Sequence, residues 1–310
     1  MADRLVSSRI RIGPARLPSR ESPEEAIDDL LERGYSACEI DFGSGFWMDY
    51  PFAARLGELA REHDIALSIH APLFGFMGHL EAGGRKFTSA VGALDRSAGI
   101  AAASGAELVV FHPGFLLGRS REDAIDAVVE QLAMLRDRLE GKGRAVPFGV
   151  EVMGRVRDLG SIEDVVEISS RLGWVRPVID FAHMHATSDG AFTEVEPFVD
   201  ALAVVDAVLG PEVPFHMHQS DSQSPQEQSD AELVPFHIHF SDIAFANRNE
   251  TKHLPYGEGT LRVGPLREAL ARFERPATTI SESPDEASSQ TILEVLHGLR
   301  DDVLAEPSGK

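Results

Sequence analysis

Short apolar runs alternate along this chain with longer segments that repeat hydrophobic residues at helical spacing. Eight of these runs predict buried strands, at residues 6–12, 37–42, 65–70, 107–112, 147–151, 177–181, 235–240 and 277–282. Regular alternation of eight strands with helices favours a closed (β/α)8 TIM barrel over an open doubly wound sheet. The sequence therefore predicts an α/β protein with one barrel domain over residues 1–304 and a flexible tail at 305–310.

The helical segments between these runs carry ordinary helix signals. Hydrophobic residues recur on one face of segment 122–139, namely Ile125, Val128, Val129, Leu132, Leu135 and Leu139. Ser22 and Ser161 each precede acidic residues and are typical of helix N-caps. The hydrophobic faces of these helices are expected to pack against the outside of the strand barrel.

A repeat interrupts the regular spacing before the seventh predicted strand. Residues 213–221 (VPFHMHQSD) return 21 positions later as 234–242 (VPFHIHFSD), with seven of nine positions identical. The polar segment between the copies indicates an exposed insertion, which we place at 213–233. We assign the strand to the second copy; if the first copy formed it, His218 would replace His239 as a candidate ligand.

Potential metal ligands stand at the ends of six predicted strands, 29 to 59 residues apart. They are His70, His112, Glu151, Asp180 with His183, His239 and Glu282. The carboxyl ends of barrel strands meet at one face, so these side chains are expected to converge there. Isolated carboxylates buried at strand ends would be costly without a cation. With Glu250 and His253 from a following loop, the set could hold two or three ions, and Glu151, in the middle of the series, is the best catalytic bridge.

The types of donor atom limit which metal ions could bind. The single cysteine, Cys38, has no partner for a thiolate site, so imidazole and carboxylate must hold any ion. Such mixed donors suit Zn²⁺, with Mn²⁺ or Fe²⁺ as alternatives. Two or three close ions can activate a water and steady both oxygens of a phosphodiester, which favours phosphate ester hydrolysis.

The charge and hydrophobicity of the chain limit which nucleic-acid and membrane partners it could have. The net charge of −21 argues against general nucleic-acid binding, but Arg85, Lys86, Arg119 and Arg155 all follow predicted strand ends on the ligand side. No apolar run approaches the 18 residues of a membrane span, and the N-terminus lacks a signal-type hydrophobic stretch. We expect a cytoplasmic monomer without a membrane partner.

The ligand-bearing segments together resemble the endonuclease IV family of apurinic/apyrimidinic endonucleases (AP endonuclease family 2), within the xylose-isomerase-like barrel group. The matching segments are SIHAPLF at 68–74, VVFHPG at 109–114, GVEVMG at 149–154, VIDFAHMHA at 178–186, HIHFSD at 237–242, ETKHLPYGEG at 250–259 and SESPD at 281–285. They span most of the chain from the third predicted strand onward. As an ordered set they are specific, although each piece alone is weak.

The resemblance implies a trinuclear zinc site. His70, His112 and Glu151 would hold one ion, and Glu151 would bridge to a second held by Asp180, His239 and Glu282. The third would take His183 and His253 with a carboxylate. Many relatives have an aspartate two residues before this last histidine, where this chain has Thr251, and we take Glu250 as the substitute.

The resemblance also implies an activity in base excision repair: hydrolysis of the DNA backbone on the 5′ side of an abasic site, leaving a 3′-hydroxyl. Damaged double-stranded DNA would be the partner, and the mouth loops would extrude the lesion. Trp47 is a candidate wedge, and Arg85, Lys86, Arg119 and Arg155 are candidate phosphate contacts. Acidic residues of the insertion, Asp221, Glu227, Asp230 and Glu232, are expected near the same DNA face.

Two other functions share this pattern. A sugar isomerase or epimerase on the same barrel would use a single ion at Glu151, Asp180, His239 and Glu282, with carboxylates moving protons. A metal-bearing binding protein would keep the ligands without turnover. The additional histidines His70, His112 and His253 favour the multinuclear hydrolase.

Overall fold

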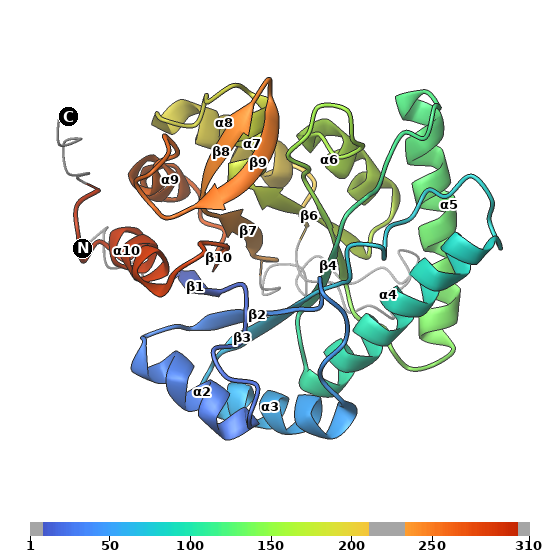
Figure 1. The fold of residues 1–310 in the computed structure, drawn as a ribbon, viewed down its shortest axis with the longest axis horizontal. Helices are drawn as coiled ribbons and strands as arrows, with labels where there is room; N and C mark the ends of the chain where they lie inside the picture. The colour runs from blue at the N-terminus through green and yellow to red at the C-terminus, as the bar shows by residue number, and fades with distance from the viewer. Residues whose placement is uncertain (1–8, 211–232, 303–310) are drawn as a thin grey trace, which may run out of the picture.

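The computed structural model describes residues 9–210 and 233–302, which form a single barrel (Figure 1). Its eight parallel strands are β1 (Ile10–Pro14), β2 (Ala37–Asp41), β3 (Ala66–His70), β4 (Leu108–Phe111), β5 (Phe148–Glu151), β6 (Val175–Asp180), β7 (Phe236–Phe240) and β10 (Ala277–Ser281). They are hydrogen-bonded in the order β1-β10-β7-β6-β5-β4-β3-β2. The Ser36 amide donates to the Ile12 carbonyl at 2.9 Å and brings β2 back to β1, so the barrel is nearly closed. The predicted barrel fold is confirmed.

Helices cover the outside of this barrel (Figure 1). In the described part of the chain they are α2 (Pro23–Glu32), α3 (Tyr50–Glu62), α4 (Arg85–Ser104), α5 (Arg121–Glu140), α6 (Ile162–Arg171), α7 (Phe181–Thr187), α8 (Val195–Asp206), α9 (Val263–Leu270) and α10 (Glu286–Leu296). Ser22 caps α2, and Ser161 forms a capping box with Asp164 at α6, as the sequence predicts. The helix predicted over 122–139 is α5.

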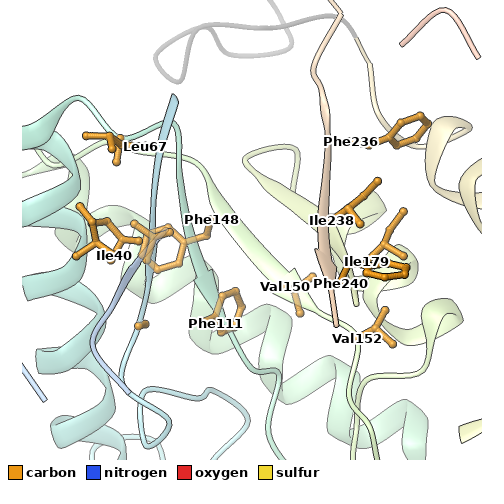
Figure 2. Close-up of a cluster of buried hydrophobic side chains, with 14 of the residues drawn as sticks. Ile40, Leu67, Phe111, Phe148, Val150, Val152, Ile179, Phe236, Ile238 and Phe240 are labelled. Atoms are coloured by element: carbon orange, nitrogen blue, oxygen red, sulfur yellow. The ribbon is translucent and has the colours of Figure 1, made fainter. Parts of the chain in front are cut away.

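Side chains alternate along the strands, so one set points outward to the helices and the other points into the barrel. One set of alternating side chains packs against the helices; Figure 2 labels ten of its members, including Ile40, Phe148 and Phe240. The other set faces into the barrel, where apolar contacts are small clusters such as Leu108, Val110 and Val178. The outer layer therefore supplies most of the apolar core, and the barrel lumen is left free to carry polar groups.

The first strand begins and ends later than predicted. We expected a strand over 6–12, whereas β1 runs from Ile10 to Pro14, and residues 6–8 lie outside the described range. Gly13 explains the extension, because a Cβ at this position would lie 1.6 Å from the Ala37 carbonyl oxygen. Only glycine lets β1 continue this close to β2.

The second copy of the repeat is the seventh strand, because β7 comprises Phe236–Phe240. The first copy, residues 213–221, lies outside the described residues, as does the tail at 305–310. The Arg275 guanidinium donates to the carbonyl oxygens of Leu209, Gly210 and Val234, so it holds the two flanks of the insertion together. These flanks lie at the amino end of β7, opposite to the face where the strands end.

An antiparallel hairpin follows β7 on the carboxyl side of the barrel. Its strands are β8 (Asp242–Ala246) and β9 (Asn249–Leu254), and Figure 1 shows them in orange beside α7. The buried Asp242 carboxylate accepts hydrogen bonds from the amides of Gly257, Gly259 and Leu261 and so fixes the loop after the hairpin. None of the described helices is both long and apolar enough to cross a bilayer.

Candidate metal centre

All nine predicted ligands lie at the carboxyl end of the barrel. Six stand at or directly after the ends of successive strands: His70, His112, Glu151, Asp180, His239 and Glu282. His183 lies on α7, and Glu250 and His253 lie on β9. Their donor atoms form overlapping groups of three within 4.8 Å of one another, namely His70–His112–Glu151, Glu151–Asp180–His183, Glu151–His239–Glu282 and His183–Glu250–His253. The convergence predicted from the strand ends is therefore present.

Glu151 stands at the middle of these groups, and its two oxygens face different partners. Oε2 lies 3.1 Å from His70 Nε2 and 3.0 Å from His112 Nε2. Oε1 lies 3.2 Å from His239 Nδ1. Burial would raise the pKa of Glu151, but His239 and His112 hold it well below its usual value, so the side chain is a carboxylate. A carboxylate whose two oxygens face different histidines is placed to bridge two ions.

Asp180 is a buried carboxyl group beside His183, whose Nδ1 lies 3.1 Å from Asp180 Oδ2. Its Oδ1 accepts the amide hydrogen of His183 at 2.7 Å, whereas Oδ2 has no hydrogen-bond partner. Burial raises the pKa of Asp180 to about 8 despite the attraction of His183, and repulsion from Glu282 and Glu151 adds to the rise. An orphaned buried oxygen among other carboxylates fits a position where a cation belongs.

Several histidines present one ring nitrogen to the centre and use the other to bind the surrounding protein. The Nδ1–H group of His70 donates to the Ala71 carbonyl at 2.9 Å, and that of His183 donates to the Val152 carbonyl at 2.8 Å. His253 Nδ1 lies 2.5 Å from Ser241 Oγ. Because a carbonyl oxygen can only accept, the hydrogen bonds of His70 and His183 favour the tautomer in which Nε2 has a lone pair for metal.

A β-bulge in the hairpin places Glu250 in the third ligand group. Ala244 pairs with Lys252 and Phe245 pairs with Glu250, so Thr251 is the extra residue that is skipped in the register of the two strands. In a regular strand, residues 250 and 253 would point to opposite faces, and the extra residue puts both on one face. As a result, Glu250 Oε2 lies 2.8 Å from His183 Nε2. Gly154 makes room for it, since a Cβ there would lie 2.6 Å from this oxygen.

Comparison with known proteins places the fold in a family. A family model described as the xylose isomerase-like TIM barrel matches residues 27–301. The chain belongs to this family. The uncharacterized protein MJ0133 of Methanocaldococcus jannaschii is 29% identical over 273 residues, which cover 88% of this chain and 91% of that protein.

Solved structures of the xylose isomerase-like barrels include two different activities among the neighbours of this chain. Endonuclease IV from Thermus thermophilus superimposes with a TM-score of 0.65 at 17% identity, covering 93% of this chain and 98% of the other. A D-tagatose 3-epimerase-like protein superimposes with a TM-score of 0.64 at 18% identity, covering 93% and 96%. Both likenesses concern the fold, and the choice between activities depends on the residues of the site.

The donor set fits a divalent metal centre of the kind that this family of barrels carries. Imidazole nitrogens and carboxylate oxygens surround the centre, and Cys38 is buried on β2 and is absent from the ligand groups found among the described residues. These donors suit Zn²⁺, Mn²⁺ or Fe²⁺. The orphaned Asp180 oxygen and the Glu151 carboxylate, whose two oxygens face different histidines, are the observations that favour occupancy by cations.

The bulge leads to a prediction about the third ligand group. We expect Glu250→Gln to lower the metal content by one ion per chain, because a neutral amide is a much weaker ligand beside His183 and His253. Thr251→Val is the matched control: the Thr251 hydroxyl donates to the Ala244 carbonyl and contacts no ligand. Elemental analysis of both variants after identical dialysis measures the difference. Equal metal loss in the two variants would assign the effect to the hairpin rather than to the carboxylate.

The five predicted DNA contacts lie in different environments. Arg85 and Lys86 are exposed at the start of α4, and Arg155 is exposed but lies 3.4 Å from Glu250 Oε1. Arg119 is half-buried and donates to the carbonyls of Leu116 and Gly78, so it holds two mouth loops together. Trp47 donates to the Asp41 carbonyl at 3.1 Å and packs edge-on against Phe52. DNA contact by these side chains stays a prediction.

Sequence reasoning missed a buried carboxylate directly beneath the centre. Glu39 lies in the middle of β2, with Ser68 opposite it on β3, and accepts hydrogen bonds from Ser68, His237 and His239. The available signal was an acidic residue inside the buried run ACEIDF, on the face that points into the barrel. Attention to strand ends alone passes over it.

Proposed function

We propose that this protein is a metal-dependent endonuclease that hydrolyses a DNA phosphodiester on the 5′ side of an abasic site. The observation that supports it best is the presence of two ligand groups beyond those that one ion requires. Glu151, Asp180, His239 and Glu282 already suffice for one ion. His70 with His112, and His183 with Glu250 and His253, extend this set on both sides.

The side chains of the centre would hold the ions and keep the ligand rings oriented. Divalent ions bound there would supply a water of lowered pKa and neutralise the charge that develops on the phosphodiester. Glu151 holds adjacent ligand groups at a fixed separation, because its two oxygens contact different histidines. The outer hydrogen bonds of His70 and His183 keep both rings oriented before the substrate arrives, so no reorganisation is needed during the reaction.

Exposed apolar side chains around the mouth suit a nucleic-acid substrate better than a small sugar. They lie on the loops that follow β3, β4 and β5: Leu73, Phe74, Leu80, Phe115, Leu117 and Val156. A monosaccharide bound at the metal centre would leave them in water. Aromatic and apolar side chains at this place could instead contact bases next to an extruded lesion.

Sugar isomerisation or epimerisation is the second candidate. It is favoured by the group of Glu151, His239 and Glu282, whose donor atoms lie within 4.8 Å of one another and which with Asp180 would supply four ligands for a single ion. The likeness of the fold to an epimerase-like protein favours it too. Metal content separates the two functions: near three ions per chain supports the nuclease, and near one ion supports sugar chemistry.

The decisive experiment incubates metal-replete protein with a duplex that carries one abasic analogue, beside an undamaged duplex of the same sequence. We expect one nick, on the lesion strand and 5′ of the analogue, with a 3′-hydroxyl end that a polymerase extends. Both duplexes remaining intact while a ketose is converted to its epimer would overturn the proposal.

Arg85 tests the proposed DNA face separately from the chemistry. We expect Arg85→Ala to weaken binding of the abasic duplex and to reduce the slope of log affinity against log salt by about 1, as for the loss of one phosphate contact. Arg61→Ala is the control, because Arg61 lies in the last turn of α3 at the opposite end of the barrel. Binding measured by fluorescence anisotropy at several salt concentrations checks both, and metal content should stay unchanged. An equal loss for both variants would indicate a general effect of charge.

A further inference from the structure

A second polar layer lies inside the barrel below the metal centre. Glu39 is 1% exposed, and its Oε2 accepts a hydrogen bond from Ser68 Oγ at 2.8 Å. The same oxygen lies 3.3 Å from His237 Nε2 and 3.3 Å from His239 Nε2. One buried carboxylate therefore gathers a hydroxyl and two imidazoles, and one of these, His239, is also a ligand of the centre.

His239 differs from the other histidines of the centre in its outer partner. His70 and His183 donate to backbone carbonyls, and His253 contacts a serine hydroxyl. His239 is fully buried and turns Nδ1 toward Glu151 and Glu282, at 3.2 and 3.4 Å. Its Nε2 faces the Glu39 carboxyl group, 3.2 Å from Oε1 and 3.3 Å from Oε2.

We propose that Glu39 is a positioning residue of the metal centre: it holds His239 in the Nε2–H tautomer and so directs the Nδ1 lone pair at the ion shared with Glu151, Asp180 and Glu282. The inference rests on the proposed metal centre, whatever its substrate. Ser68 and His237 hold Glu39 in turn, since both donate to its Oε2.

The contacts of Glu39 and its place in the barrel favour this role. A carboxylate that accepts from the outer nitrogen increases the basicity of a ligating imidazole and restricts rotation of its ring. Glu39 cannot contact a substrate at the mouth, because it lies in the middle of β2 whereas the ligands stand at the strand ends. A buried carboxylate without such a function would be expensive to keep. Glu39 therefore acts on the centre through His239.

The test is the metal affinity of Glu39→Gln, which preserves shape but removes the charge. Competition between the metal-free protein and a chromogenic chelator, with Zn²⁺ and with Co²⁺, measures the affinity for each ion. We expect one ion to bind about 10 to 100 times more weakly and the others to be unaffected, the usual range for loss of an outer carboxylate. The visible spectrum of the Co²⁺-loaded protein should change at the same stoichiometry.

Two further variants separate positioning from general stability. Ser68→Ala removes another hydrogen bond to Glu39 and leaves His239 in place, so it should change the affinity much less. In a His239→Ala background, Glu39→Gln should not weaken ion binding any further, because Glu39 acts on the ion only through His239. If Glu39→Gln does not fold, Glu39→Asp replaces it in the same comparison, with a smaller loss expected.

Two outcomes would overturn the role of Glu39. One is parental affinity and an unchanged Co²⁺ spectrum in Glu39→Gln. The other is an equal loss of affinity with and without His239, which would make Glu39 a structural residue only. Neither readout involves nucleic acid or sugar, so the inference can fail while the proposed nuclease activity stands, and the reverse.

Discussion

Glu151→Gln is expected to abolish phosphodiester cleavage and to remove at least one metal ion. Each oxygen of Glu151 contacts different histidines, and an amide in its place offers one weak oxygen donor and one nitrogen that cannot bind metal. We expect turnover to fall by about 10³-fold or more, the scale on which transition-state charge stabilisation is lost when a preorganised group is removed. Cleavage of the abasic duplex and elemental analysis of the same samples measure both effects.

A surface variant provides the control for this substitution. Glu163 is exposed in the first turn of α6, on the outside of the barrel, so Glu163→Gln makes the same chemical change away from the centre. It should keep full activity and metal content. Parental cleavage by Glu151→Gln would show that the carboxylate is dispensable and that the reaction takes place elsewhere.

Metal removal is expected to destabilise the protein, and increasingly so as pH rises from about 6.5 to 9. In the metal-free protein, burial would lower the pKa of His70, but Glu151 and Glu39 raise it to about 9, and burial raises the pKa of Asp180 to about 8. Both groups bind protons more tightly when folded than when unfolded. Their stabilising contribution is therefore complete at low pH and is lost as pH rises through these values.

Metal binding has the opposite dependence on pH. The ligands must lose their protons to bind an ion, so affinity increases as pH rises. The difference in melting temperature between metal-loaded and chelator-treated protein should therefore widen from pH 6.5 to 9. At a free metal concentration of about 1,000 times Kd, the stabilisation would be about 4 kcal/mol. Calorimetry at several pH values checks this, and a constant or narrowing difference would contradict the assignment of these groups as ligands.

The sequence predicted the convergence of the candidate ligands because strand ends in a barrel obey a simple geometric rule. In a parallel barrel, polar residues that end successive buried strands must meet, and this rule found His70, Glu151 and Asp180 without any knowledge of contacts. The sequence also assigned the seventh strand to the second repeat copy, and the position of β7 confirms this assignment. Element boundaries were less secure, as β1 illustrates.

Other residues depended on contacts that no local pattern reveals. Glu39 lies one layer below the strand ends, and its partners His237 and His239 are about 200 residues away in the chain. Arg119 is a predicted phosphate contact, and its guanidinium also donates to the carbonyls of Leu116 and Gly78. The partner of an arginine cannot be inferred from its place after a strand.

One expectation about DNA concerns the insertion. We expected acidic residues of segment 213–233 near the DNA face, but the flanks of this segment lie at the amino end of β7. Asp221, Glu227, Asp230 and Glu232 themselves lie outside the described residues. Their expected place near the DNA face stays a prediction.

The bulge at Thr251 has a practical consequence for recognising proteins of this type. A pattern search that demands an acidic residue two places before the last histidine would discard this chain, because it finds Thr251 there. With one extra residue in β9, the acidic residue stands three rather than two positions before the histidine. The bulge at this residue still places the Glu250 side chain on the same face as His253. Searches that tolerate a single gap at this point would recover such chains, and deleting Thr251 should yield a protein that keeps its third ligand group.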